Sequence, residues 1–88
     1  YTDSMNVKIL YFAGLREALG QSSEQLALPA GVGSVGELHA HLVARGGAWE
    51  ALGKTKNLRA AVNQKMAAMD ASIRDGDEVA FFPPVTGG

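Results

Sequence analysis

The sequence contains no cysteine, and this absence excludes several kinds of chemistry at once. A chain without thiols forms no disulfides, holds no metal through thiolates and has no side-chain sulfur to act as a nucleophile or sulfur carrier. If the protein carries an activated chemical group, that group must be attached somewhere other than a cysteine.

An excess of charge and long apolar runs are also missing. The formal net charge is -1 and the pI is about 6.1, so the chain lacks the basic footprint of proteins that bind nucleic acids or anionic membranes. The apolar runs are too short to span a bilayer, and no basic-then-apolar leader opens the chain. We therefore expect a cytoplasmic protein. Residues 1–4 are interpreted as a cloning remnant, with Met5 as the natural start.

What is present is enough for one small domain. The chain has 88 residues, of which 47% are hydrophobic, and this size supports a single core. Runs of β-branched, aromatic and apolar residues predict strands at 6–12, 22–28, 58–62, 66–69 and 78–82. Helices are predicted at 14–20, from the Ser34–Glu37 capping box to Gly46–Gly47, and as a turn at 49–52.

The order of these elements predicts an α+β fold, with a mixed sheet of four to five strands packed on one main helix. It matches the ubiquitin-like β-grasp, in which the first and last strands lie side by side and parallel. The domain is expected to cover residues 5–82, and residues 83–88 are expected to form an extended tail.

The alternation of side chains along the first and last predicted strands separates buried from exposed residues. Lys8 and Glu78 mark the solvent-facing side of the first and last strands, because charged side chains are rarely buried. Phe12 and Phe82 fall on this side and are expected to be exposed and close together where the tail departs. Adjacent exposed aromatic rings usually mark an interface.

Several candidate sites inside the domain have simpler interpretations. His39 and His41 are two positions apart on a helix, so their side chains diverge and are expected to be a solvated flank rather than a metal site. The acidic residues at 75–78 follow the chemistry of a tight turn, and Trp49 is expected to anchor the edge of the core. No phosphate-binding glycine loop or catalytic motif is present.

The C-terminus is the remaining candidate. Pro83 and Pro84 stiffen the chain as it leaves the last strand, and residues 83–88 could extend about 20 Å. Gly87 and Gly88 lack a Cβ atom and could enter a narrow tunnel in another protein. There ATP could activate the terminal carboxylate as an acyl-adenylate.

Three segments resemble a known family. "VKILYFAGLREALG" (7–20), "AAVNQ" (60–64) and "DGDEVAFFPPVTGG" (75–88) are similar to the small, sulfur-carrying subunits of molybdopterin synthase, the MoaD type. The resemblance covers nearly the whole chain from Met5, and its most specific part is the ending.

The resemblance implies a mechanism and partners. An ATP-dependent activating enzyme of the MoeB type would adenylate Gly88, and sulfur from a persulfide would convert it to a thiocarboxylate. The tail would then enter the large, catalytic MoaE-type subunit and give its sulfur to cyclic pyranopterin monophosphate, forming the molybdopterin dithiolene. The chain would be no enzyme on its own and would hold no permanent cofactor. The implied partner interface consists of Phe12, Met66, Phe82, Pro83, Pro84, Val85 and Thr86, with Gly87 allowing the tail to thread.

Other functions remain open on the residues alone. A thiamine-pathway sulfur carrier, or a ubiquitin-like modifier whose Gly-Gly end joins a lysine, would share the fold and the tail. A β-grasp adaptor with an inert tail belongs to a different class. The intact mass of the chain after exposure to an activating enzyme, ATP and a sulfur donor would separate a carrier from an adaptor.

Overall fold

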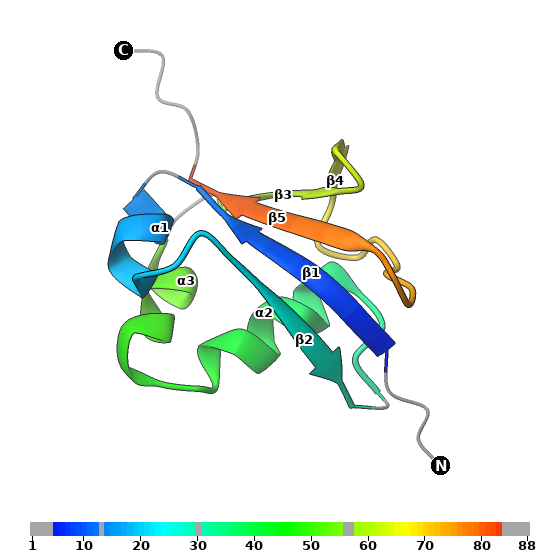
Figure 1. Cartoon of the computed structure of the whole chain (residues 1–88), viewed down its shortest axis with the longest axis horizontal. Helices are drawn as coiled ribbons and strands as arrows, with labels where there is room; N and C mark the ends of the chain where they lie inside the picture. Colours follow the sequence, from blue (N-terminus) through cyan, green and yellow to red (C-terminus); the bar gives the residue numbers. More distant parts are fainter. Residues whose placement is uncertain (1–4, 13, 30, 56–57, 84–88) are drawn as a thin grey trace.

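The computed structural model describes residues 5–12, 14–29, 31–55 and 58–83 (Figure 1). Its elements are, in chain order, β1 (Met5–Tyr11), α1 (Gly14–Leu19), β2 (Ser23–Leu28), α2 (Val35–Val43), the 3-10 turn η1 (Gly47–Trp49), α3 (Glu50–Lys54), β3 (Arg59–Val62), β4 (Lys65–Ala67) and β5 (Glu78–Phe82). None of the helices in these residues is long and apolar enough to cross a membrane.

The five strands form one mixed sheet in the order β2-β1-β5-β3-β4. β1 and β5, the first and last strands, lie side by side and run parallel, whereas the other neighbouring pairs are antiparallel. The helices lie on one side of the sheet (Figure 1). The predicted α+β, ubiquitin-like β-grasp fold is confirmed.

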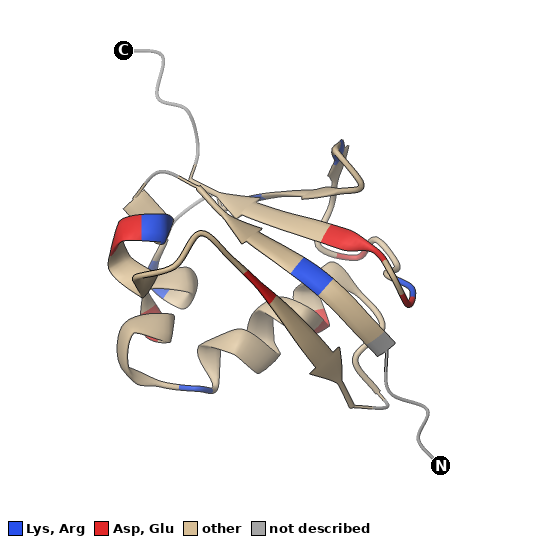
Figure 2. Cartoon of the chain, in the orientation of Figure 1, with Lys and Arg blue, Asp and Glu red and all other residues tan. Residues whose placement is uncertain are grey.

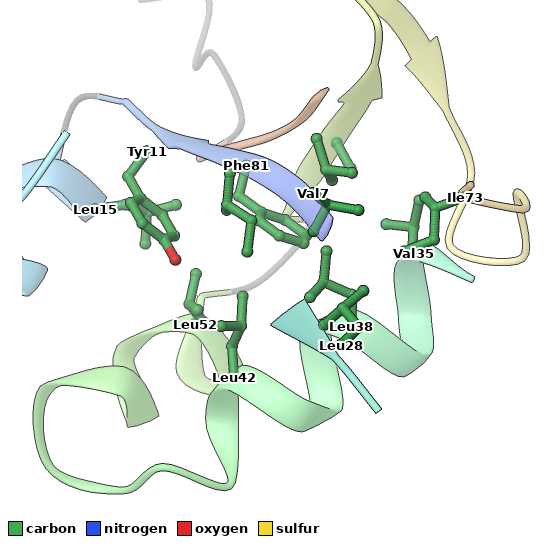
Figure 3. Packing of buried hydrophobic residues seen from close by; sticks show 13 residues of the cluster. Val7, Tyr11, Leu15, Leu28, Val35, Leu38, Leu42, Leu52, Ile73 and Phe81 are labelled. Atoms are coloured by element: carbon green, nitrogen blue, oxygen red, sulfur yellow. The ribbon is translucent and has the colours of Figure 1, made fainter. Parts of the chain in front are cut away.

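The core lies between the inner face of the sheet and the helices (Figure 3). Alternate residues of β1 point inward, so Val7, Ile9 and Tyr11 are almost completely buried, as predicted from the two-residue period of a strand. On α2, the buried residues Val35, Leu38 and Leu42 recur at helical spacing and meet Phe81 of β5 and Leu52 of α3 in the same cluster. Burial of this cluster is the main stabilising term.

The start of α2 is fixed by side-chain and main-chain hydrogen bonds. The Ser34 hydroxyl accepts a 3.2 Å bond from the Glu37 amide, as the capping box predicts. In a capping box the glutamate also accepts a bond from the amide of the N-cap residue, but here the Glu37 carboxylate accepts a 3.0 Å bond from the Gly33 amide. The Gly36 amide donates a 2.7 Å bond to the Met69 carbonyl oxygen, and a Cβ atom at Gly36 would come within 3.0 Å of that oxygen. The loop after β4 is therefore docked on the helix.

A polar and aromatic cluster joins β1, β2 and the segment after α2. The Tyr11 hydroxyl donates a 2.9 Å hydrogen bond to Glu24, whose carboxylate also accepts two bonds from the Arg45 guanidinium. Arg45 stacks 4.5 Å from the ring centroid of Trp49, and Trp49 meets Tyr11 edge-on at 5.5 Å. Trp49 is partly buried against the core, so its predicted role as an anchor is confirmed.

The structure corrects two expectations. The fourth strand covers Lys65–Ala67 rather than 66–69, because the chain turns away there to dock on α2. His39 and His41 were expected to form a solvated flank, but both are partly buried, and the Nε2 atom of His39 lies 2.8 Å from the carbonyl oxygen of Leu52. The docking of α3 against α2 brings these residues together.

Candidate functional site

The last strand delivers the chain to one end of the sheet. β5 is the central strand, flanked by β1 and β3, and it ends at Phe82, followed by the half-buried Pro83. The predicted carrier residues Gly87 and Gly88, and the predicted interface residues Pro84, Val85 and Thr86, lie outside the described residues. The described part of the site is therefore the surface that surrounds the exit of this tail.

Two aromatic residues lie at this exit, as predicted. β1 and β5 are in register through the pair Tyr11 and Phe81, so Phe12 and Phe82 follow next to each other on the opposite face. Phe12 is 46% exposed, as expected. Phe82 was expected to be exposed but is half-buried, because a central strand has neighbours on both sides, whereas Phe12 lies just beyond the end of β1.

A row of apolar side chains continues from these rings across the outer face of the sheet. The register places Leu10 beside Ala80, Ala80 opposite Ala61, and Ala61 opposite Met66. Met66, predicted from the family pattern, is 64% exposed. We call the outer-face patch the set Leu10, Phe12, Ala61, Met66, Ala80 and Phe82.

Three members of the outer-face patch were missed by sequence reasoning. Ala61 and Ala80 are buried, yet they are not part of the core cluster, which agrees with their position on the outer face. Leu10 is half-buried on the same face. The alternation within each strand assigns all three to this face, but only the register between strands places them in one row.

The outer face carries charges of both signs at one end and an arginine beside an aromatic residue at the other. At the end remote from the tail, the register places Lys8 of β1 beside Glu78 of β5. At the tail end, Arg59 of β3 lies opposite Phe82. Figure 2 shows the acidic band of β5 at the beginning of the strand and none where the strand ends.

The acidic turn before β5 is used for structure, as predicted. The Asp75 carboxylate accepts a 2.8 Å bond from the Asn6 amide, and the Asp77 carboxylate accepts a 2.8 Å bond from the Arg74 amide. Gly76 between them has a φ of 87°, which favours glycine. Among the described residues, no group of three or more His, Cys, Asp or Glu side chains could hold a metal ion.

The "AAVNQ" segment also has a structural role. Asn63 and Gln64 have positive φ angles of 52° and 70°, which is typical of the tight type I′ turn that joins two antiparallel strands. The Asn63 side chain accepts a 3.0 Å bond from the Glu78 amide and donates a 3.0 Å bond to Asp77. The β3–β4 turn is therefore tied to the first residue of β5, which fixes the strand that leads to the tail.

Comparison with known proteins decides the family. The model described as the ThiS family matches residues 9–88. The chain belongs to the ThiS family. One relative is the molybdopterin synthase sulfur carrier subunit of Escherichia coli, which is 43% identical over 82 residues, covering 93% of this chain and 99% of the relative.

Solved structures of the same fold come from several sources. The small archaeal modifier protein 1 of Haloferax volcanii superposes with a TM-score of 0.74 at 26% identity, covering 92% of this chain and 99% of that chain. A chain of the protein-protein complex of subunits 1 and 2 of the molybdopterin-converting factor from Helicobacter pylori gives a TM-score of 0.61 at 24% identity, covering 96% of this chain and 100% of that chain. The second likeness concerns the fold alone.

Proposed function

We propose that this ThiS-family chain is the sulfur carrier subunit of a molybdopterin synthase and that it carries sulfur on the carboxylate of Gly88. The observation that supports this most is the parallel pairing of β1 with β5. This pairing directs the end of the chain out of the sheet beside the outer-face patch. The sulfur carrier subunit of E. coli is similar over nearly its whole length, and the ThiS-family match extends to Gly88.

The proposed chemistry uses the main chain, not a side chain. Attack of the Gly88 carboxylate on ATP forms an acyl-adenylate and releases pyrophosphate. The terminal sulfur of a persulfide then attacks the carbonyl carbon and displaces AMP, and a thiol reductant cleaves the remaining S–S bond to leave a thiocarboxylate. Transfer of that sulfur to the pterin precursor, followed by hydrolysis, returns the carboxylate. The absence of cysteine is compatible with this route, because the sulfur is held at the C-terminus.

The outer-face patch is the proposed docking surface for two partners, the large catalytic subunit and the ATP-dependent activating enzyme. Its exposed side chains, Phe12 and Met66, lie on either side of β5, the strand that leads to the tail. Burial of aromatic and Met side chains at the centre of an interface commonly supplies most of the binding energy. Docking on this face would place the tail against the partner at a fixed position.

Intact-mass measurement tests the carrier function. The chain is incubated with the activating enzyme, ATP and a sulfur donor, and a matched sample lacks ATP. We expect the ATP-containing sample alone to gain the mass difference of one oxygen replaced by sulfur, located on the C-terminal peptide. An unchanged mass in both samples would argue for an adaptor with an inert tail.

A second candidate function is a protein modifier whose Gly88 joins a lysine. The similarity to the small archaeal modifier protein 1 favours it. The same incubation, supplemented with cell extract, separates the two functions. A carrier returns its tail as a free carboxylate, whereas a modifier leaves the C-terminal peptide attached to lysines of other proteins.

A further inference from the structure

Among the described residues, Arg59 is a cation with no acidic neighbour in its row of the sheet. It lies opposite Phe82 in the antiparallel register of β3 and β5, and it is exposed. Within the described residues the ion pairs are Arg45 with Glu24 and Lys54 with Glu50. The row at the tail end of the outer face therefore contains Phe12, Phe82 and the exposed residue Arg59.

Two other basic residues, Lys8 and Arg45, have different surroundings. On the same face, Lys8 lies beside Glu78. Arg45 holds Glu24 through two hydrogen bonds and stacks on Trp49, so it contributes to the fold. Arg59 contributes to neither arrangement. Its position at the rim of an apolar surface is typical of interface arginines, since the guanidinium pairs with carboxylates in a fixed, two-pronged geometry.

We propose that Arg59 receives a carboxylate from the large synthase subunit when that subunit docks on the outer-face patch. This inference rests on the proposed function. Apolar contact is non-directional, so the patch alone does not fix how the partner is rotated about it. A charge-assisted contact at Arg59, beside Phe82 and Pro83, adds a second point off the centre of the patch. It sets the rotation that aligns the departing tail with the partner's active site.

The large subunit is the partner to which we assign this carboxylate. The E. coli relative is named as a subunit of the synthase, so its lasting association is with the rest of that enzyme. Charged pairs at an interface chiefly set specificity, orientation and association rate. These are the properties that a carrier needs if its tail must arrive in one register.

The experiment compares Arg59→Gln and Arg59→Glu with the control Arg74→Glu. Arg74 is also exposed but lies in the turn before β5, at the opposite end of that strand, so its reversal makes the same change in net charge far from the tail. Affinity for the purified large subunit is measured at low salt (about 0.05 M) and at about 1 M, where charges are screened beyond about 3 Å. Thermal unfolding of each variant confirms that the fold is unchanged.

We expect Arg59→Gln to weaken binding about tenfold at low salt and Arg59→Glu to weaken it further. Both effects should shrink at high salt, and Arg74→Glu should bind like the wild type. Equal losses for Arg59→Glu and Arg74→Glu would reduce the effect to net charge and overturn the proposal. Unchanged affinity of both Arg59 variants for the large subunit would also overturn it while leaving the carrier function intact. If the wild-type chain itself failed to bind the large subunit, the proposed function would fail together with this inference.

Discussion

The main-chain amide of Phe12 donates a 3.3 Å hydrogen bond to the carbonyl oxygen of Phe81. This bond extends the parallel pairing of β1 and β5 by one step beyond the end of β1. It holds the aromatic ring of Phe12 next to the point where the chain leaves the sheet. The most exposed aromatic ring of the outer-face patch is thus positioned by the same strand pair that ends at Phe82.

Truncation of either exit aromatic, Phe12 or Phe82, is expected to weaken docking of the large subunit. Phe12→Ala should reduce the affinity for the large subunit by on the order of 2 kcal/mol, with little change in melting temperature, because the ring is 46% exposed. Phe82→Ala should lose a similar amount of binding energy. It should also lower the free energy of unfolding by about 1 kcal/mol, because Phe82 is half-buried and its removal exposes neighbouring apolar groups. Calorimetric titration and thermal unfolding measure the two effects.

Met69→Ala is a matched control for these truncations. Met69 is an apolar residue that is 38% exposed, but it lies in the loop docked on α2, outside the outer-face patch. Its variant should bind the large subunit with wild-type affinity. Equal losses in the Met69 and Phe12 variants would show that binding does not depend on the outer-face patch.

The Tyr11 hydroxyl predicts a loss of stability at alkaline pH. Burial, together with the hydrogen bond and negative charge of Glu24, raises the pKa of Tyr11 well above its ordinary value of about 10. As the pH rises past about 10, the ordinary pKa of tyrosine, the unfolded state releases its Tyr11 proton while the folded state keeps it. The contribution of this group is therefore fully present below about pH 10 and decreases above it.

Tyr11→Phe isolates that contribution. Below pH 10 the variant should be less stable by about 1 kcal/mol, the usual net value of one hydrogen bond, because Glu24 loses a donor but keeps Arg45. Above pH 10 the difference between wild type and variant should narrow. Denaturant unfolding at pH 7 and at several alkaline values measures it. A difference that stays constant with pH would show that the hydroxyl does not titrate differently in the two states.

Gly76 tests the turn that starts β5. Its φ is 87° and a Cβ atom there would have open space around it, so any cost of Gly76→Ala comes from backbone strain alone. We expect a destabilisation of about 1 kcal/mol. Gly14→Ala is the control, because a Cβ at Gly14 also meets open space but without a positive φ; it should be neutral or slightly stabilising. Equal melting temperatures for the two variants would show that an alanine at position 76 causes no backbone strain.

The sequence predicted the elements whose signals are local. The alternation of Val7, Ile9 and Tyr11 identified the buried face of β1, and the Ser34–Glu37 capping box identified the start of α2. The same holds for Gly76, since its backbone requirement follows from the Asp-Gly-Asp triplet. Each of these signals is contained in a few consecutive residues.

Three features that depend on how the elements pack were not predicted. The contact between His39 and the carbonyl of Leu52 exists only because α3 docks on α2. The partial burial of Phe82 follows from the central position of β5, which no single strand reveals. The row from Leu10 to Met66 likewise depends on the register of four strands. The proposed role of Gly88 rests on the resemblance of the tail to a family, because a terminal Gly-Gly alone is also typical of a loose chain end.

The position of the terminal carboxylate gives the most direct test of the carrier function. If Gly88 is the group that is activated, function depends on the chain ending at that residue and not merely on glycine being present there. One residue added after Gly88 moves the carboxylate by roughly 3.5 Å, which exceeds the tolerance for aligned reacting atoms. Deletion of Gly88 withdraws it by a similar distance. Both variants leave the sequence of residues 5–82 unchanged, so we expect wild-type melting temperatures together with loss of adenylation and of thiocarboxylate formation.

A bulky residue in place of Gly87 separates threading from register. Gly87→Leu leaves the number of residues between β5 and the carboxylate unchanged but adds a side chain to the part of the tail that, in the proposed function, enters a narrow channel of the partner. We expect slower acquisition of sulfur, measured by intact mass over time, rather than complete loss. All three tail variants should still bind the large subunit through the outer-face patch with no more than a modest change in affinity. If the chain lengthened by one residue, with its tail uncleaved, acquired sulfur as fast as the wild type, the activated group would not be the carboxylate at the end of the chain.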